Sequence, residues 1–270
     1  MGIPANPIVV CGSGPSLLTV PFDGIGLPYS AVSTAIKYTP EPEHWLLVDR
    51  MNRAHQRAPH SAQERGIGGT AAWRSKEIVK VVPQARQRYF KDCPSEVIGV
   101  HRDKQTEFLG GDPDHLHYCF NRSMLFAVEW LSWRYDCLIF AGIDLQVDPN
   151  QEFLNQRKAR SKVNSRNHSH RIEYGHWERF AGLAKAKGVL WLNWTPGGPL
   201  GHIMEDFDDW RRRHQGDGVP SWVSTSVQPP RSEPQRGPAG ERVEAVVCPA
   251  PVPRPAPHGR PRSPRKRRRR

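Results

Sequence analysis

Residues 8–18 read IVVCGSGPSLL, an apolar run that stops abruptly at a glycine-rich turn. Four apolar residues bounded by turn-forming ones are typical of a strand that is buried on both faces of a parallel sheet. In such sheets, ligands bind beyond the carboxyl ends of the strands, which is where this turn would lie. The stretch therefore has two interpretations, a phosphate-binding turn or a plain connection between a strand and a helix.

The residues of the turn are compatible with anion binding. Gly12 and Gly14 allow another chain segment or a ligand to approach the backbone closely. Pro15 suits the first position of a helix, and Ser13 or Ser16 can cap the exposed amides of that helix. We predict that the backbone N–H groups of this turn face an anion, as they do at the start of other helices.

Further short apolar runs follow, separated by helical patterns. The runs are residues 29–33, 45–48, 77–82, 97–101, 137–141 and 189–194. Helices are predicted over 122–135, over 177–187 before Gly188 and, as a short one, over 152–160, whereas 50–72 is polar and is predicted to be a long loop or lid. Alternating helices and strands predict a Rossmann-like, doubly wound α/β fold with a mostly parallel sheet.

Composition divides the chain. Residues 216–270 contain 12 of the 26 prolines and no Leu, Ile or Phe, and they carry +8 of the net charge of +12. Such a segment cannot bury enough apolar surface to offset the entropy of ordering it. We predict a folded domain at 1–205, a linker at 206–215 and a disordered tail at 216–270. The basic run between Arg260 and Arg270 would attract a polyanion, or it is only a solvated extension.

Cysteine usage and hydropathy indicate the compartment. The five cysteines form no CxxC pair, and Cys11 and Cys137 fall inside apolar runs, as expected of reduced, buried thiols. The start of the chain lacks the pattern of a signal peptide, and no apolar run approaches the ~20 residues that cross a bilayer. We expect a soluble, cytoplasmic protein.

Polar residues follow several predicted strands. Ser33, Asp49 and Asp144 come at strand ends, so we expect them to point into one crevice at the carboxyl edge of the sheet. A single aspartate at a strand end is also a common structural cap. Their convergence on one edge favours a binding site.

The densest histidine cluster is NSRNHSHRIEYGHWERF, which contains His168, His170 and His176. We predict that these residues precede or open the helix at 177–187, where a histidine could act as a general base near neutral pH. A surface histidine or an adventitious metal site would also fit. The spacing lacks a third ligand, so no metal site is predicted.

Three blocks of the chain resemble a known family. GSGPSLL after the first strand, SMLFAVEWLSWRYDCLIFAGIDL, and SHRIEYGH followed by a helix and VLWLNW are similar to the bacterial sialyltransferases typified by the Campylobacter lipooligosaccharide enzymes. They also resemble a wider group with the same fold, which includes pterin diphosphokinase-like proteins and uncharacterised bacterial and phage proteins. The resemblance covers roughly residues 7–200 and implies that the folded domain binds a nucleotide sugar.

The resemblance also implies site residues. The nucleotide contacts would be Gly12, Ser13, Gly14, Ser16, Ser33, Asp49, Asn121, Ser123, Gly142 and Asp144. The catalytic base would be His176 or, as second choice, His170. Ser13, Ser33 and Asp49 stand where the family has Asn, and the tyrosine pair that supports the leaving phosphate has no match, so the resemblance does not extend to the identity of the donor.

Three functions are compatible with these residues. The leading one is a metal-independent glycosyltransferase-like enzyme without a cofactor, which transfers a sugar from a nucleotide to the hydroxyl of a glycan or another acceptor. The second is a diphosphokinase or phosphotransferase, which would need Mg²⁺ on carboxylates such as Asp49, Asp144 or Asp148. The third is a non-catalytic nucleotide-binding module with a polyanion-binding tail.

Overall fold

The computed structural model describes residues 3–22, 25–48, 75–90, 93–118, 123–145, 160–195 and 198–215, with Pro220 and Trp222, and only the backbone of 160–171. All of them belong to one compact unit, Met1–Gln228. The predicted loop at 50–72 lies outside the described residues. So do residues 152–159 of the short predicted helix and the predicted tail, apart from Pro220 and Trp222.

The strands of the described chain form one open, nine-stranded sheet in which every neighbouring pair is parallel. They are β1 (Pro7–Cys11), β2 (Tyr29–Val32), β3 (His44–Leu46), β4 (Val79–Pro83), β5 (Val97–Asp103), β6 (His115–His117), β7 (Cys137–Ala141), β8 (Leu190–Asn193) and β9 (Glu205–Asp206). The doubly wound α/β fold predicted from the alternating pattern is confirmed.

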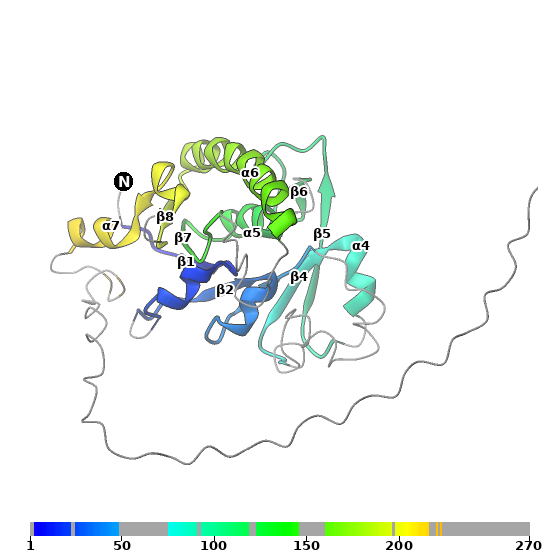
Figure 1. Cartoon of the computed structure of the whole chain (residues 1–270). Coiled ribbons are helices and arrows are strands. Elements are labelled where there is room, and N and C mark those ends of the chain that lie inside the picture. The colour runs from blue at the N-terminus through cyan, green and yellow to red at the C-terminus, as the bar shows by residue number, and fades with distance from the viewer. Residues whose placement is uncertain are drawn as a thin grey trace, which may run out of the picture. The chain divides into compact units, whose positions relative to one another are not determined.

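The strand order places a reversal of the winding at the centre of the sheet. The order is β6-β5-β4-β3-β2-β1-β7-β8-β9, so the chain winds outward from β1 to β6 and then returns to β1's other side at β7. Figure 1 shows β1 between β2 and β7. Open parallel sheets bind ligands beyond the carboxyl ends of two neighbouring strands whose connections leave in opposite directions. In this sheet that position lies between β1 and β7, and we call it the switch point.

Helices cover both faces of the sheet. They are η1 (Pro15–Thr19), η2 (Ser33–Lys37), α4 (Gln84–Gln87), η3 (Arg88–Phe90), α5 (Ser123–Ser132), α6 (Arg160–Ala186), η4 (Pro199–His202) and α7 (Phe207–Arg213). Side chains from α5 and α6 belong to one buried cluster, and side chains from η1, η2 and α7 belong to a second. Figure 1 shows α5 and α6 together on one side of β1 and β7.

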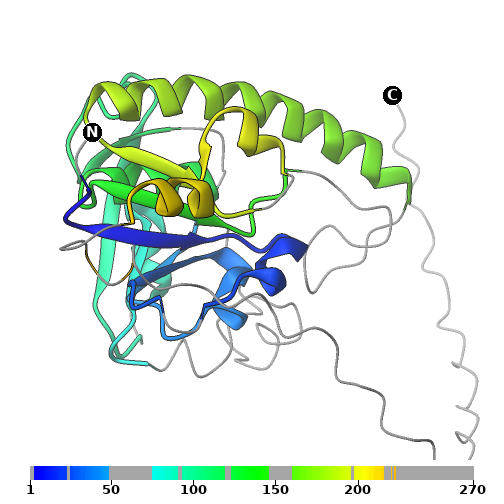
Figure 2. The ribbon, with the colours of Figure 1, turned by 90° about the vertical axis from the view of Figure 1, so that its left-hand side faces the viewer.

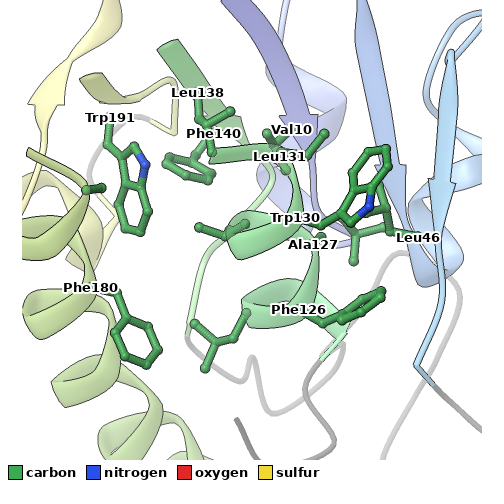
Figure 3. Close-up of a cluster of buried hydrophobic side chains, with 14 of the residues drawn as sticks. Val10, Leu46, Phe126, Ala127, Trp130, Leu131, Leu138, Phe140, Phe180 and Trp191 are labelled. Carbon is green, nitrogen blue, oxygen red and sulfur yellow. The ribbon is translucent and has the colours of Figure 1, made fainter. Parts of the chain in front are cut away.

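The central strand explains why the sequence folds into three layers. Ile8 and Val10 pack with the α5 and α6 cluster, while Val9 and Cys11 pack with the opposite one, and all four side chains are fully buried. A strand buried on both faces needs apolar residues at every position, which is the pattern of residues 8–11. Figure 3 shows the first cluster, with Val10 above α5 and Phe180 on α6.

Seven of the strands were predicted within a few residues, and two were not. β6 has three residues with two histidines, and β9 has two acidic residues. Both are edge strands, with one neighbour each, so they need neither length nor a continuous apolar sequence. A search for apolar runs passes over such strands.

The prediction was wrong about where the third helix begins. α6 starts at Arg160 instead of 177, so His170 and His176 lie within the helix and do not precede it. The buried positions among its described side chains, Glu173, Trp177, Phe180 and Ala184, have helical spacing. The polar first half carries no apolar stripe, so the pattern gave no start signal. None of the described helices has the length and apolar character needed to cross a membrane.

The folded unit reaches beyond residue 205, where the folded domain was predicted to end, because α7 falls in the predicted linker at 206–215 and Trp222 falls in the predicted tail. Trp222 is buried and stacks on Trp210 of α7, with ring centroids 5.5 Å apart and planes 3° apart. It also faces Phe207 at 6.5 Å. Trp222 thus packs on α7 as part of the folded unit.

Candidate functional site

The candidate site lies where the segment after β1 meets the segment after β7. The Gly12–Ser16 turn packs directly on Gly142–Asp144. A Cβ at Gly12 would come within 2.5 Å of the Gly142 carbonyl oxygen, and a Cβ at Gly14 within 2.6 Å of Asp144 Oδ2. The two glycines are needed because two chain segments approach each other here, so part of the glycine signal is structural.

Backbone hydrogen bonds join the two segments. The Gly12 N–H donates to the Ala141 carbonyl at 2.7 Å, and the Gly14 N–H donates to the Gly142 carbonyl at 2.8 Å. The predicted ring of free N–H donors is therefore largely occupied by oxygens of this chain. Within the described residues, the Ser13 N–H is the amide of the turn that has no such partner.

Asp144 takes the place of an external anion at the turn. Its Oδ2 accepts a hydrogen bond from the Ser16 N–H at 3.1 Å, and its Oδ1 accepts one from the Ser16 hydroxyl. The prediction that Ser13 or Ser16 caps the helix that begins at Pro15 is therefore wrong. Gly14 is the N-cap residue of η1 and makes no side-chain cap hydrogen bond, and Ser16 binds Asp144 instead.

Strained backbone borders this contact. Gly142 has φ of +69°, and an added Cβ would lie 2.6 Å from the Gly12 carbonyl oxygen. Leu145, which follows Asp144, has φ of +47°, and Ser33 at the end of β2 has φ of +54°. Non-glycine residues in the left-handed region cost free energy and gather at functional sites. Two of them follow the carboxyl ends of strands next to the turn.

The remaining predicted contacts are distributed along the same edge. The Ser33 carbonyl accepts a hydrogen bond from Trp45 Nε1 at 2.8 Å, which holds the end of β2. Ser123 Oγ accepts one from the Val48 N–H at 3.3 Å, which ties the start of α5 to the chain after β3. Asp49 and Asn121 lie outside the described residues. The structure thus brings Gly12, Gly14, Ser16, Gly142 and Asp144 together and places Ser33 and Ser123 at neighbouring strand ends.

His176 lies on α6, half-buried, with its ring stacked on Phe180 at 5.7 Å between centroids. It precedes the last residue of α6, Ala186, by ten residues, which is about 15 Å along a helix. That is close to the length of β7, about 16 Å for its five residues. α6 leads into β8 and is antiparallel to the strands. His176 therefore lies near the level of the carboxyl ends of the strands. Figure 2 shows the first part of α6 extending past η1. The side chain of His170 is not among those described.

The described residues contain no group of three or more His, Cys, Asp or Glu arranged to hold a metal ion. Asp49 and Asp148, two of the carboxylates considered for Mg²⁺, are outside those residues. The third, Asp144, is engaged with Ser16.

Sequence reasoning missed a buried carboxylate on α5. Glu129 is 1 % exposed, and its two oxygens accept hydrogen bonds from the backbone N–H groups of Leu109 and His117 at 3.0 and 2.9 Å. Burial raises its pKa to about 7, although the two amides and the charge of Arg102 act in the opposite direction. The signal was present in SMLFAVEWLS, where one acidic residue stands in an apolar helix, because such residues are rarely buried without partners.

No protein-family model matches the chain, and no curated protein matches it. Among solved structures, it is similar to the MAf glycosyltransferase of Magnetospirillum magneticum AMB-1, with 12% identity and a TM-score of 0.43. That match covers 74% of this chain and 33% of the other, so the chain spans a third of that protein's length.

Two sialyltransferase structures are also similar. Sialyltransferase CST-II in complex with a trisaccharide acceptor and CMP is 10% identical, with a TM-score of 0.38. CstII of Campylobacter jejuni in complex with CMP-3FNeuAc is 12% identical, with a TM-score of 0.37. Each match covers 82% of this chain and 89% of the other.

Proposed function

We propose that the chain is a glycosyltransferase-like enzyme that binds a nucleotide sugar at the β1–β7 switch point and transfers the sugar to an acceptor hydroxyl. The observation that carries the proposal is the packing of the Gly12–Ser16 turn on Gly142–Asp144 at that point, with strained backbone on either side. Ligands of open parallel sheets bind in this crevice, and a strained backbone persists where function requires it.

The hydrogen bonds at the turn support a proposal for which part of the donor each residue would contact. A carboxylate repels a phosphate and accepts hydrogen bonds from hydroxyl groups, so Asp144 suits a ribose or sugar hydroxyl better than a phosphate. The Ser13 N–H and hydroxyl then remain for the phosphate, and Ser33 follows β2, the strand beside β1. Ser13 is therefore the residue of the turn that we expect to control nucleotide affinity.

A histidine of α6 is proposed as the general base. His176 is the first choice because it is half-buried near the level of the carboxyl edge, and His170 is the second because it lies on the same helix nearer its N-terminus. The base would deprotonate the acceptor hydroxyl as that oxygen attacks the sugar carbon. Catalysis of this kind contributes roughly 10² to 10⁴ in rate. The proposed transfer needs no metal ion and no further cofactor.

Calorimetry of the full chain with nucleotides and nucleotide sugars tests the binding step. Cytidine nucleotides are the first probes, because CMP is the ligand of the similar sialyltransferase structures. We expect Ser13→Asp to abolish binding of the nucleotide that binds the wild type, through repulsion of its phosphate. Ser95→Asp, in the segment before β5, is the matched control and should leave binding unchanged. Equal loss in both variants, or no binding to the wild type, would refute the site.

Turnover tests the base and separates the alternatives. His176→Gln should lower the rate by roughly 10² to 10⁴ with nucleotide binding intact, and normal turnover would move the assignment to His170. Activity that survives a chelator favours sugar transfer, whereas activity that depends on Mg²⁺ favours a phosphotransferase. Nucleotide binding without turnover of any donor would favour a non-catalytic module, whose contact with polyanions would depend on residues 260–270.

A further inference from the structure

Glu129 joins two segments that are distant from the switch point in the strand order. Its Oε1 accepts from Leu109, in the loop between β5 and β6, and its Oε2 accepts from His117, at the end of β6. Leu109 is held at φ of +56°, a conformation that a leucine rarely adopts. A single buried side chain thus fixes both the strained point of the loop and the strand that follows it.

Both segments place aromatic rings against α6. Phe108, next to Leu109, is buried and stacks on Phe180 with centroids 3.9 Å apart and planes 6° apart. His117 meets the same phenyl ring edge-on at 6.3 Å, and its Nδ1 pairs with the Thr106 carbonyl of the loop. Figure 3 shows Phe180 on the side of α6 that faces α5. The position of the Phe180 ring therefore depends on the two segments that Glu129 holds.

Phe180 is in turn the ring on which His176 rests. The two lie one helical turn apart, with centroids at 5.7 Å and planes inclined by 26°. A displaced Phe180 would change a surface against which the imidazole packs, because side chains in a close-packed core shift together.

We propose that Glu129 is a positioning residue for His176, acting through the aromatic side chains that pack against Phe180. The inference deepens the proposed function, because it rests on His176 as the base. Glu129 does not touch the reacting atoms. It holds the loop and β6, whose aromatic side chains pack against Phe180, the ring on which the imidazole stacks.

The same arrangement makes the support of His176 sensitive to pH. Burial raises the pKa of Glu129 to about 7, against the charge of Arg102 on β5 and the amides of Leu109 and of His117 on β6. Protonation converts one of its oxygens into a donor that faces an N–H group, so one hydrogen bond to the backbone is lost. Both hydrogen bonds are complete only above that pKa.

Amide hydrogen exchange and histidine NMR of the full chain test the proposal without a substrate. We expect Glu129→Gln to speed exchange of the Leu109 and His117 amides about 10-fold or more, since a lost hydrogen bond to a charged group is worth at least that factor. We also expect it to shift the His176 ring resonance, which a His176→Gln spectrum identifies. Asp112→Asn is the matched control, because Asp112 lies in the same loop and also accepts two backbone amides but is exposed. It should change neither measurement.

A second variant separates positioning from general loosening. Phe108→Leu leaves the hydrogen bonds of Glu129 in place but removes the stacked ring. We expect it to shift the His176 resonance while the Leu109 and His117 amides stay protected. An unshifted His176 resonance in either folded variant would overturn the proposal. If Glu129→Gln does not fold, Phe108→Leu alone provides this test. These measurements use no nucleotide, so an unshifted resonance would overturn the role of Glu129 without contradicting the proposed function. Conversely, a failure of nucleotide binding would contradict the proposed function without changing these measurements.

Discussion

Asp144 and Glu129 each hold separate parts of the chain together, one at a partly exposed position and the other at a buried one. Each carboxylate accepts two hydrogen bonds and joins segments that are distant in sequence. Asp144 is partly exposed at the switch point, among glycines and strained backbone. Glu129 is buried on α5, where it holds the loop between β5 and β6 and the end of β6, a region that we call the flank. Exposure leaves Asp144 with lone pairs for a ligand, and burial leaves Glu129 only its structural partners.

The difference suggests that the two regions respond to different perturbations. Added volume should disrupt the switch point, because backbone approaches backbone there. A change of charge or pH should disrupt the flank, because a buried carboxyl group holds it. The four predictions that follow test this contrast.

The largest effect is expected from Gly142→Ala. The substitution puts a Cβ at a residue with φ of +69°, 2.6 Å from the Gly12 carbonyl oxygen and 2.7 Å from Leu17 Cβ. We expect the free energy of unfolding to fall by about 3 kcal/mol, from backbone strain and overpacking together. Gly182→Ala on α6 is the control, because its Cβ meets no atom within 4 Å. It should raise stability by up to about 1 kcal/mol in urea unfolding. Equal effects would contradict the close approach.

Glu129→Gln should change how stability depends on pH. Since burial raises the pKa of Glu129 from 4.5 to about 7, the folded state binds the extra proton in this interval. The contribution of Glu129 to stability is therefore full below pH 4.5 and is lost as the pH rises through 7. The wild type should lose up to about 3 kcal/mol relative to Glu129→Gln between pH 4.5 and 8. Parallel curves in urea unfolding would show that Glu129 does not titrate in this range.

A smaller effect is expected from Asp144→Asn. The variant keeps the shape of the side chain but removes the charge and one acceptor for Ser16, so we expect a loss of about 1 kcal/mol in the free energy of unfolding. Because Asp144 is proposed to accept a hydrogen bond from a ribose or sugar hydroxyl, the loss of its carboxylate should also weaken binding of the nucleotide sugar, measured by calorimetry. Unchanged or tighter binding would contradict that role of Asp144.

Asp112→Asn should have the smallest effect. The carboxylate of Asp112 accepts hydrogen bonds from two backbone amides, as that of Glu129 does, but it is exposed, and its pKa is lowered by His115 and the amides. Water replaces a lost partner at an exposed site, so no change in the urea midpoint is expected at pH 7. A clear loss would mean that burial is not what distinguishes the two carboxylates.

The switch point could be predicted from the sequence better than the flank, because its signals come from residues that are adjacent in the chain. A strand buried on both faces and a turn that cannot hold a side chain both leave marks on adjacent residues, as in IVVCGSG. The packing of Gly12 on Gly142 and the pairing of Ser16 with Asp144 join residues about 130 positions apart, and no local pattern records such a contact.

The flank was missed for the same reason. β6 is too short to show a period, and the first half of α6 extends without an apolar stripe. Glu129 alone was visible as an acid in an apolar helix. Its partners Leu109 and His117 become known only when the loop is folded onto α5.

The position of β1 in the sheet has a consequence for synthesis of the chain. β1 pairs with β2 early in the sequence, but its other neighbour, β7, begins at Cys137. A ribosome that has released the first hundred residues has therefore made a strand with one edge unpaired, and the Gly12 turn still lacks the segment on which it packs. Contacts between such distant residues slow folding, and open strand edges promote aggregation. The nascent chain should thus need protection until α5 and β7 have left the exit tunnel.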